Sequence, residues 1–184
     1  MRTSKRTVIL DTIVEIIETS GFSEVTYENV ATQCGMSKSG LIYHFPSRED
    51  MIRSVHEYMA QLWEEELIEA AGGTAEEVSP ATRLRANLQV SLETATRAEL
   101  LMSIDSAADP ELSEIWTRLL RRWNPPAEEI ATDKDACMAY VVQMISDGLW
   151  ANDYLNGNQL TKAQRKAIVE AAAKLIPESA EAVD

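Results

Sequence analysis

The sequence contains little cysteine, glycine or proline, and it has no long hydrophobic run. Of its 184 residues, 2 are Cys, 7 are Gly and 6 are Pro. Cys34 and Cys137 are far apart and have no Cys or His at metal-ligand spacing, so we expect neither a disulfide framework nor a metal site. No apolar run reaches the roughly 18 residues that a membrane-spanning helix requires. Residues 1–20 carry acidic side chains within their apolar stretch, unlike a signal peptide, which predicts a cytoplasmic protein without membrane contact.

Basic residues are in the minority. The chain has 17 Lys and Arg against 30 Asp and Glu, so its formal net charge is −13, which excludes a wholly basic nucleic-acid coat. The excess is uneven, because residues 1–48 contain five basic and five acidic side chains, and residues 49–184 carry all of the negative excess. A neutral N-terminal segment followed by an acidic remainder indicates that only residues 1–48 approach a polyanion such as nucleic acid.

Helical periodicity accounts for most of the chain. Hydrophobic residues make up 45% of the sequence and recur at spacings of three and four, as they do between Val8 and Ile17. No segment shows the sustained two-residue alternation of a β-strand, so we predict an all-α fold of about nine helices. Capping and stop signals place these helices at residues 4–19, 27–33, 38–44, 47–71, 80–96, 98–107, 110–123, 134–154 and 161–176.

The short predicted helices 27–33 and 38–44 are joined by a glycine turn, which is the sequence form of a helix-turn-helix. Thr26 and Ser37 can cap the two helices, and Gly35 permits the positive φ of the turn. We interpret the outer face of the second helix as a reading surface, the alternative being an ordinary helical hairpin. The expected inward residues are Val30, Ala31, Cys34, Met36 and Leu41, and the expected outward ones are Lys38, Ser39, Gly40, Tyr43 and His44.

The stretch GFSEVTYENVATQCGMSKSGLIYHFPSREDMI, Gly21 to Ile52, closely resembles the N-terminal domain of TetR-family transcriptional regulators. Two later segments, ADPELSEIWTRLLRRW and SDGLWANDYL, more weakly resemble the seventh and eighth helices of such regulators. The resemblance implies a helix-turn-helix DNA-binding domain over residues 1–47. It also implies a ligand-binding and dimerisation domain over residues 48–184.

The resemblance further implies roles at DNA for single residues. Lys38 and Ser39 would meet base edges, Gly40 would allow close approach, and the remaining candidates would contact phosphates, which bind hydroxyls, cations and helix N-termini. Because no Arg, Asn or Gln lies between Ser37 and Phe45, we expect modest direct readout, with a share left to water-mediated contacts and DNA shape. The full expected DNA-binding set is Thr26, Ser37, Lys38, Ser39, Gly40, Tyr43, His44, Ser47 and Arg48.

Two further predictions concern residues 1–48. The resemblance implies a flexible basic arm formed by Arg2, Lys5 and Arg6. It also implies that Phe45 is buried between the third and fourth helices.

The predicted helix 134–154 has too much apolar surface for one buried stripe. Its neighbour 161–176 is rich in small apolar residues, so the pair suits a two-fold, four-helix interface, and we expect a homodimer. The remaining large apolar residues are candidates for a ligand cavity, with plain core packing as the alternative. These candidates are Trp63, Met102, Trp116, Trp123, Tyr140 and Met144.

Taken together, these patterns predict a ligand-responsive transcriptional regulator. We expect a repressor that binds a palindromic double-stranded DNA operator as a homodimer and is released by a small-molecule effector, with no cofactor. One alternative is a small helical enzyme using Cys34 or His44, but the sequence has no nucleophile elbow, no HExxH and no readable pair of catalytic carboxylates, so no catalytic residue is predicted. The other alternative is a helical protein-interaction module that does not bind DNA.

Overall fold

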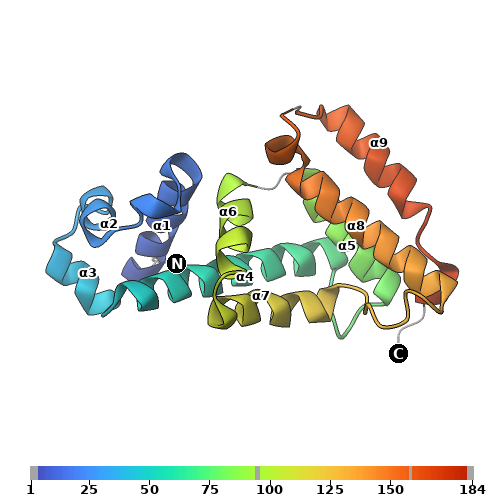
Figure 1. Cartoon of the computed structure of the whole chain (residues 1–184), viewed down its shortest axis with the longest axis horizontal. Helices are drawn as coiled ribbons and strands as arrows, with labels where there is room; N and C mark the ends of the chain where they lie inside the picture. Colours follow the sequence, from blue (N-terminus) through green and yellow to red (C-terminus); the bar gives the residue numbers. More distant parts are fainter. Residues whose placement is uncertain (1–3, 94–95, 158, 182–184) are drawn as a thin grey trace. The chain divides into compact units, whose positions relative to one another are not determined.

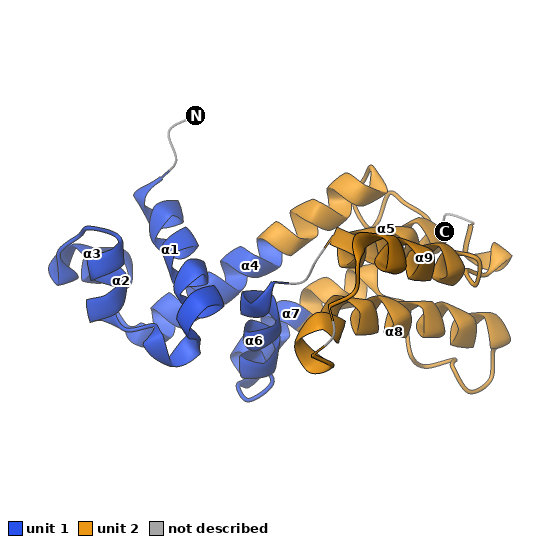
Figure 2. Cartoon of the chain, turned by 90° about the horizontal axis from the view of Figure 1, so that it is seen from above, with its two compact units in different colours: residues 1–61, 96–116 blue, residues 62–95, 117–184 orange. Residues whose placement is uncertain are grey.

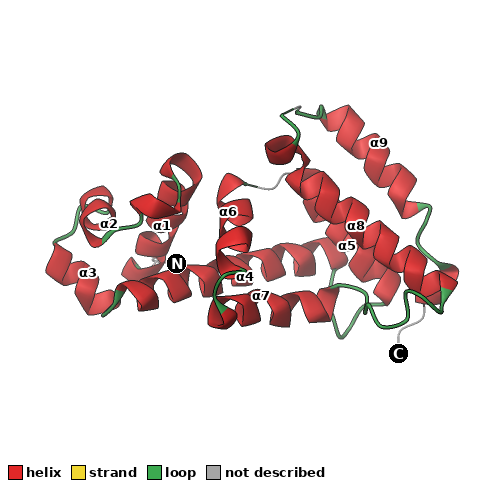
Figure 3. Cartoon of the chain, viewed as in Figure 1, coloured by secondary structure: helices red, strands yellow, loops and turns green. Residues whose placement is uncertain are grey.

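The computed structural model describes residues 4–93, 96–157 and 159–181. Within these ranges the chain forms nine α-helices and two short 3-10 helices, and no strand occurs, which confirms the predicted all-α fold (Figures 1 and 3). None of the helices in the described ranges combines the length and apolar character needed to cross a membrane. The helices group into two compact units, residues 1–61 with 96–116 and residues 62–95 with 117–184 (Figure 2).

The first unit has a core built on an N-terminal helix. Ile9, Ile13, Ile16 and Ile17 are all buried and lie on one face of this helix, because their spacings follow the helical repeat. The elements of the unit are α1 (Lys5–Ser20), η1 (Phe22–Glu24), α2 (Tyr27–Gln33), α3 (Lys38–His44), the first part of α4 (Arg48–Ala71), α6 (Arg97–Ser106) and the first part of α7 (Pro110–Trp123).

Two helix ends in this unit satisfy each other's backbone. The Glu18 carboxylate, near the end of α1, accepts a hydrogen bond from the Ala98 N–H at the start of α6 at 2.6 Å. In return, Arg97 Nη1 donates to the Glu18 carbonyl at 2.7 Å. Helix ends leave such backbone groups without partners inside the helix, so this exchange fastens α6 to α1.

The second unit has its own apolar core. Its helices are the remainder of α4 and α7, α5 (Pro80–Glu93), α8 (Lys134–Leu155) and α9 (Lys162–Ala173), followed by η2 (Glu178–Glu181). The core joins α5, α8 and α9, with Ile145, Val169 and Ile176 packed at its edge. Its buried members are Leu84, Leu88, Ala139, Val142 and Ala172.

Two predicted helices were too long at their C-terminal ends. Thr96 is not the end of α5 but the N-cap of α6, where its hydroxyl and the Glu99 side chain form a capping box. Helix α9 ends at Ala173, not Ile176, and the chain tightens through hydrogen bonds from Leu175 N to Ala172 O and from Ile176 N to Ala173 O. Pro177 prevents the helix from including Ile176, since a proline disfavours helical geometry at the residue before it.

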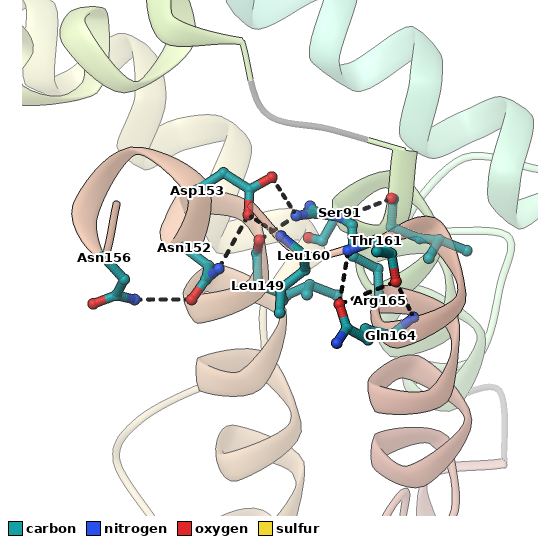
Figure 4. A network of polar contacts seen from close by, with 10 residues as sticks. Ser91, Leu149, Asn152, Asp153, Asn156, Leu160, Thr161, Gln164 and Arg165 are labelled. Atoms are coloured by element: carbon teal, nitrogen blue, oxygen red, sulfur yellow. Dashed lines mark hydrogen bonds and ion pairs between the residues drawn. The ribbon is translucent and has the colours of Figure 1, made fainter. Parts of the chain in front are cut away.

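A buried arginine holds the second unit together (Figure 4). Arg165 of α9 is 3% exposed, and its guanidinium makes four hydrogen bonds. Three go to main-chain carbonyls, those of Ser91 (2.7 Å) and Leu92 (3.1 Å) in α5 and of Leu149 (3.1 Å) in α8. The fourth goes to the Asp153 carboxylate at 3.1 Å. One side chain therefore ties α9 to both α5 and α8.

Asp153 is itself fixed by two donors on its other oxygen. Asn152 Nδ2 and the Leu160 N–H donate to Oδ1 at 3.0 and 3.2 Å. The hydrogen bond from Asn152, aided by the Leu160 N–H and the Arg165 charge, lowers the pKa of the Asp153 carboxyl. The carboxylate is thus kept ionised as a partner for the buried guanidinium.

Arg165→Met should cost about 3–5 kcal/mol of unfolding free energy, because it leaves buried carbonyls and a carboxylate without their donor. The matched control is Lys166→Met, at the exposed neighbouring position, whose ion pair with Glu170 is a surface contact at 3.8 Å. The control should change stability by less than about 0.5 kcal/mol. Urea unfolding followed by circular dichroism at one fixed protein concentration measures both. Equal losses in the two variants would contradict the role assigned to Arg165.

Candidate nucleic-acid interface

The helix-turn-helix is built from α2, a glycine turn and α3. The Thr26 hydroxyl accepts a hydrogen bond from Asn29 N at 3.2 Å and so caps α2. Gly35 has φ of +63°, which lets the chain reverse while Met36 N donates to the Ala31 carbonyl at 2.9 Å. The buried Val30, Ala31 and Leu41 close the interface as predicted, whereas Cys34 and Met36 are only half-buried.

The start of α3 is a compact polar turn. The Ser37 hydroxyl caps the helix by accepting from Gly40 N at 3.1 Å, and it lies 3.1 Å from the Ser39 hydroxyl. A Cβ at position 40 would come within 3.2 Å of the Ser37 oxygen. A residue larger than glycine at position 40 would crowd the Ser37 cap, so packing within the protein itself favours Gly40.

The outward face of α3 carries polar, aromatic and apolar groups together. Tyr43 is 84% exposed, and Lys38 and Ser39 are exposed on the preceding turn. Ser39 and Tyr43, like Lys38 and Ile42, are four residues apart and so lie on adjacent rows of one helix face. This face contains the predicted readers, and Ile42, 41% exposed, adds an apolar group that the sequence analysis did not include.

Lys38 does not point freely into solvent. Its ammonium group forms an ion pair with the carboxylate of Glu28 in α2, and this hydrogen bond lowers the pKa of Glu28. Both side chains are largely exposed, so the pair is accessible to a competing anion. The sequence analysis missed Glu28, an exposed acidic residue in the first turn of α2.

The C-terminal end of α3 is anchored by Phe45, which is fully buried as predicted. The Tyr27 hydroxyl donates to the Phe45 carbonyl at 2.6 Å, and the Arg6 guanidinium lies 4.7 Å from the centre of the Phe45 ring. Arg6 also donates to the Ser54 hydroxyl at 2.8 Å.

The predicted flexible basic arm is therefore wrong for two of its members. Lys5 and Arg6 form the first turn of α1, and Arg6 is held by its contacts with Phe45 and Ser54. Arg2 lies outside the described residues. A helix start at Ser4, whose hydroxyl accepts from Thr7 N at 3.0 Å, is the local reason.

The remaining candidates lie at the surface. Ser47 precedes α4 and accepts a hydrogen bond from Asp50 N at 2.9 Å, and Arg48 is exposed at the first position of the helix. His44 is half-buried, with its ring edge-on to Tyr43 at 5.3 Å between centroids. Three caps, at Thr26, Ser37 and Ser47, thus accompany the exposed face of α3.

The six ligand-cavity candidates are divided between the units. Met102 and Trp116 are buried in the first unit, where Trp116 Nε1 donates to His56 Nδ1 at 2.9 Å. In the second unit, Trp63 packs edge-on against Trp150, with 5.4 Å between ring centroids, and Trp123 Nε1 lies 3.5 Å from the Glu64 carboxylate. Tyr140 lines a cavity of about 630 Å³, Trp123 lines one of about 400 Å³, and Met144 is 63% exposed.

His56 is a buried contact between α4 and α7 within the first unit. Because its Nδ1 accepts from Trp116, the neutral ring carries its proton on Nε2, which lies 3.6 Å from the Asp105 carboxylate. Burial lowers the pKa of His56 below its ordinary 6.5, and the charges of Asp105 and Asp109 offset this only in part. Folding therefore favours the neutral form of this ring.

A helix-turn-helix that buries its packing residues and exposes a cation, hydroxyls and a tyrosine on its second helix is the reading device of a DNA-binding transcriptional regulator. Comparison of the sequence with known protein families gives the same class. Residues 9–55 match the family of bacterial regulatory proteins of the tetR type, and residues 81–177 match a tetracyclin repressor-like C-terminal domain. The chain belongs to the TetR family of transcriptional regulators, a family of DNA-binding proteins that are not enzymes.

Individual relatives are distant. A 54-residue stretch is 33% identical to YerO, an uncharacterized HTH-type transcriptional regulator of Bacillus subtilis (strain 168), and this match spans 29% of the chain but only 19% of YerO. A transcriptional regulator from Rhodococcus sp. Rha1 has a similar fold, with a TM-score of 0.72, 18% identity and coverage of 98% and 100% of the two chains. A protein from Saccharomonospora viridis, solved in complex with choline, has a TM-score of 0.65, 18% identity and coverage of 93% and 94%.

The depressed pKa of His56 has a measurable consequence. Below about pH 6.5 the unfolded chain takes up a proton at this residue that the folded chain does not, so stability should fall with pH until the folded-state pKa is reached. His56→Gln should remove this part of the pH dependence, measured as urea-unfolding free energy at about pH 7 and pH 5.5. The control is His44→Gln, which replaces the other histidine of the chain. The assignment is overturned if His56→Gln and wild type lose equal stability on acidification.

Proposed function

We propose that the protein is a ligand-responsive repressor that binds a palindromic operator as a homodimer and is released by a small molecule. Residues 1–47 would form the DNA-binding domain, and residues 48–184 the ligand-binding and dimerisation domain. The observation that carries this proposal is the exposed face of α3, where Lys38, Ser39 and Tyr43 lie beside three capped helix starts. The Tyr43 ring is 84% exposed, and the ring contact described for it is with the neighbouring His44.

In this proposal, α3 enters the major groove. Lys38 and Ser39 meet base edges, and Ile42 suits the methyl group of a thymine. The hydroxyls of Thr26, Tyr43 and Ser47, the His44 ring and the Arg48 cation contact phosphates on either side. Ser37 and Gly40 form the tight turn that lets the backbone approach. The acidic remainder of the chain is repelled by DNA, so binding is confined to this face.

The proposed dimer uses α8 and α9. Helix α8 buries one face in the unit core, yet Val141, Met144 and Leu155 are exposed on its other face. Helix α9 likewise exposes Ile168, and Leu175 is exposed just beyond its end. Large apolar side chains exposed on two adjacent helices favour a second copy of the chain as their partner.

The effector would act by population shift. A small molecule releases the operator only if it binds the DNA-incompetent conformation more tightly than the DNA-competent one. The choline bound to the Saccharomonospora viridis protein supports a small organic effector for this fold. Two cavities in the second unit, of about 630 and 400 Å³, offer room for one.

Lys38→Ala and Glu28→Gln should change DNA affinity in opposite directions. Removing the Lys38 cation should weaken binding by about tenfold and make the dependence on salt shallower, because one cation fewer per half-site displaces counterions from the DNA. Replacing Glu28 frees Lys38 and removes an acid from the approaching face, which should strengthen binding by up to about fivefold. Fluorescence anisotropy with labelled promoter DNA of the protein's own gene, at two salt concentrations, measures both.

Lys134→Ala is the matched control, since this lysine is exposed in the second unit, and it should bind DNA like wild type. All three variants should melt like wild type because their side chains are exposed. Unchanged affinity of a folded Lys38→Ala protein would mean that α3 is not the reading helix. Failure of the wild type to bind this DNA at low salt would leave the interaction-module alternative.

Gly148→Arg should convert the dimer into a monomer. Gly148 lies on the exposed side of α8, and a Cβ added there meets no atom within 4 Å in the protomer, so the substitution does not disturb the unit itself. In the proposed four-helix interface it inserts a charged side chain between apolar faces. Sedimentation at micromolar concentration should give about twice the chain mass of 20.5 kDa for wild type and for the Gly148→Ala control, and 20.5 kDa for Gly148→Arg. A monomeric wild type would end this proposal.

A further inference from the structure

One cavity of the second unit is lined by the end of α7, the loop that follows it, one side of α8 and Arg83 of α5. Its volume of about 630 Å³ is within the range of about 300–1,000 Å³ common for small-molecule sites. Apolar groups from Leu120, Pro125, Pro126 and Tyr140 form part of the wall. The wall also contains Asn124, Gln143 and Asp147.

Gln143 is the unusual member of this wall. Its side chain is 4% exposed, and its Nε2 donates to the Asp147 carboxylate at 2.8 Å. That bond fixes the amide orientation, because only the nitrogen can donate to a carboxylate. The amide oxygen is then left buried with no hydrogen-bond partner. An unpaired buried acceptor costs free energy, so it is either a defect or a place for a donor that arrives from outside.

A second buried acceptor in the same wall has the same deficit. Asn124 Oδ1 has no hydrogen-bond partner, and Asn124 lines this cavity and the neighbouring one of about 400 Å³. Two buried amide oxygens without donors therefore belong to residues of one wall, which also contains Asp147. A molecule that donates hydrogen bonds could satisfy both of these acceptors.

The charges around the cavity do not demand a charged ligand. Arg83 is held by the carbonyls of Ala75 and Arg122 at 3.0 and 3.4 Å, and Arg122 pairs with Glu64 at 2.6 Å. Together with Arg121, these arginines carry three positive charges, and Glu64, Glu128 and Asp147 carry three negative ones, so the formal charges cancel. A neutral donor avoids the cost of desolvating an unpaired charge.

We propose that this cavity is the effector site and that it takes a small neutral molecule with an apolar body and two or more hydrogen-bond donors. Gln143 Oε1 and Asn124 Oδ1 would accept from the donor groups, and the proline and leucine wall would cover the apolar body. The effector role rests on the proposed function above, whereas the binding chemistry of the cavity does not. Binding and DNA release are accordingly measured apart.

The probes are benzamide, a neutral primary amide with two N–H donors, and N,N-dimethylbenzamide, which has the same ring and carbonyl but no donor. Isothermal titration calorimetry of the full chain should show benzamide binding, with the dimethyl compound about tenfold weaker or more, because it leaves the acceptors unpaired. Gln143→Met keeps the side-chain length and removes one of the two acceptors, so it should weaken benzamide binding by about tenfold and reduce the discrimination between the two probes. Gln89→Met, an exposed glutamine of α5 paired with Glu93, should bind both probes like wild type.

Three results would overturn the proposed chemistry: no benzamide binding by the folded wild type, equal affinity for the two probes, or wild-type benzamide affinity in Gln143→Met. Thermal melting checks that this variant is folded, and if it is not, the two probes on the wild type decide alone. Benzamide should also lower the anisotropy of labelled promoter DNA bound to the protein. Binding with the expected discrimination but without DNA release would overturn the effector role and leave the donor-binding cavity standing.

Discussion

The reading surface depends on the burial of Leu41 and Phe45. Helices α2 and α3 have seven residues each, well below the roughly 12–15 residues at which an isolated helix becomes marginally stable in water. They persist because Val30 and Leu41 close their mutual interface and because Phe45 is buried just past the end of α3, fixed by the Tyr27 hydroxyl and the Arg6 guanidinium. Every side chain on the outward face of α3 takes its position from these inward ones. Packing and recognition are therefore assigned to different residues of the same short helix.

The Glu28 carboxylate competes with DNA for the Lys38 side chain. Lys38, the one long cationic side chain on α3, is already paired with Glu28 when no DNA is present. An exposed ion pair is weak and is screened by salt, so it does not lock the lysine. It does mean that a phosphate or base acceptor must replace an existing partner, not merely meet a free charge. A helix with few long polar readers, flanked by an acid, suits a protein that relies on phosphate contacts and DNA shape for much of its selectivity.

In the second unit, some buried polar groups have hydrogen-bond partners within the protein and others do not. The Arg165 guanidinium finds four acceptors, and its partner Asp153 is held by two further donors, so the network is complete within the protein. Such a network fixes the arrangement of α5, α8 and α9 and thereby the outer faces of α8 and α9 that we assign to the dimer. Gln143 lies on α8 as well, but its amide oxygen is left without a donor beside a cavity. The complete network suits a structural role, and the incomplete one suits a binding site.

The sequence by itself determined the all-α class, the order of the nine helices, most of their ends, the helix-turn-helix and the family, because caps, glycine turns and apolar periodicity are local signals. It also identified Leu41 as core from its place in the helix-turn-helix, and Phe45 as core through the family resemblance. It did not indicate the pairing of Lys38 with Glu28, the packing of Arg6 on Phe45, the Arg165 network or the cavity beside Gln143. Those features join residues from different helices, and Arg6 and Arg165 read as ordinary surface charges in the sequence. Only the tertiary structure decides which polar side chains are buried and whether each one finds a partner there.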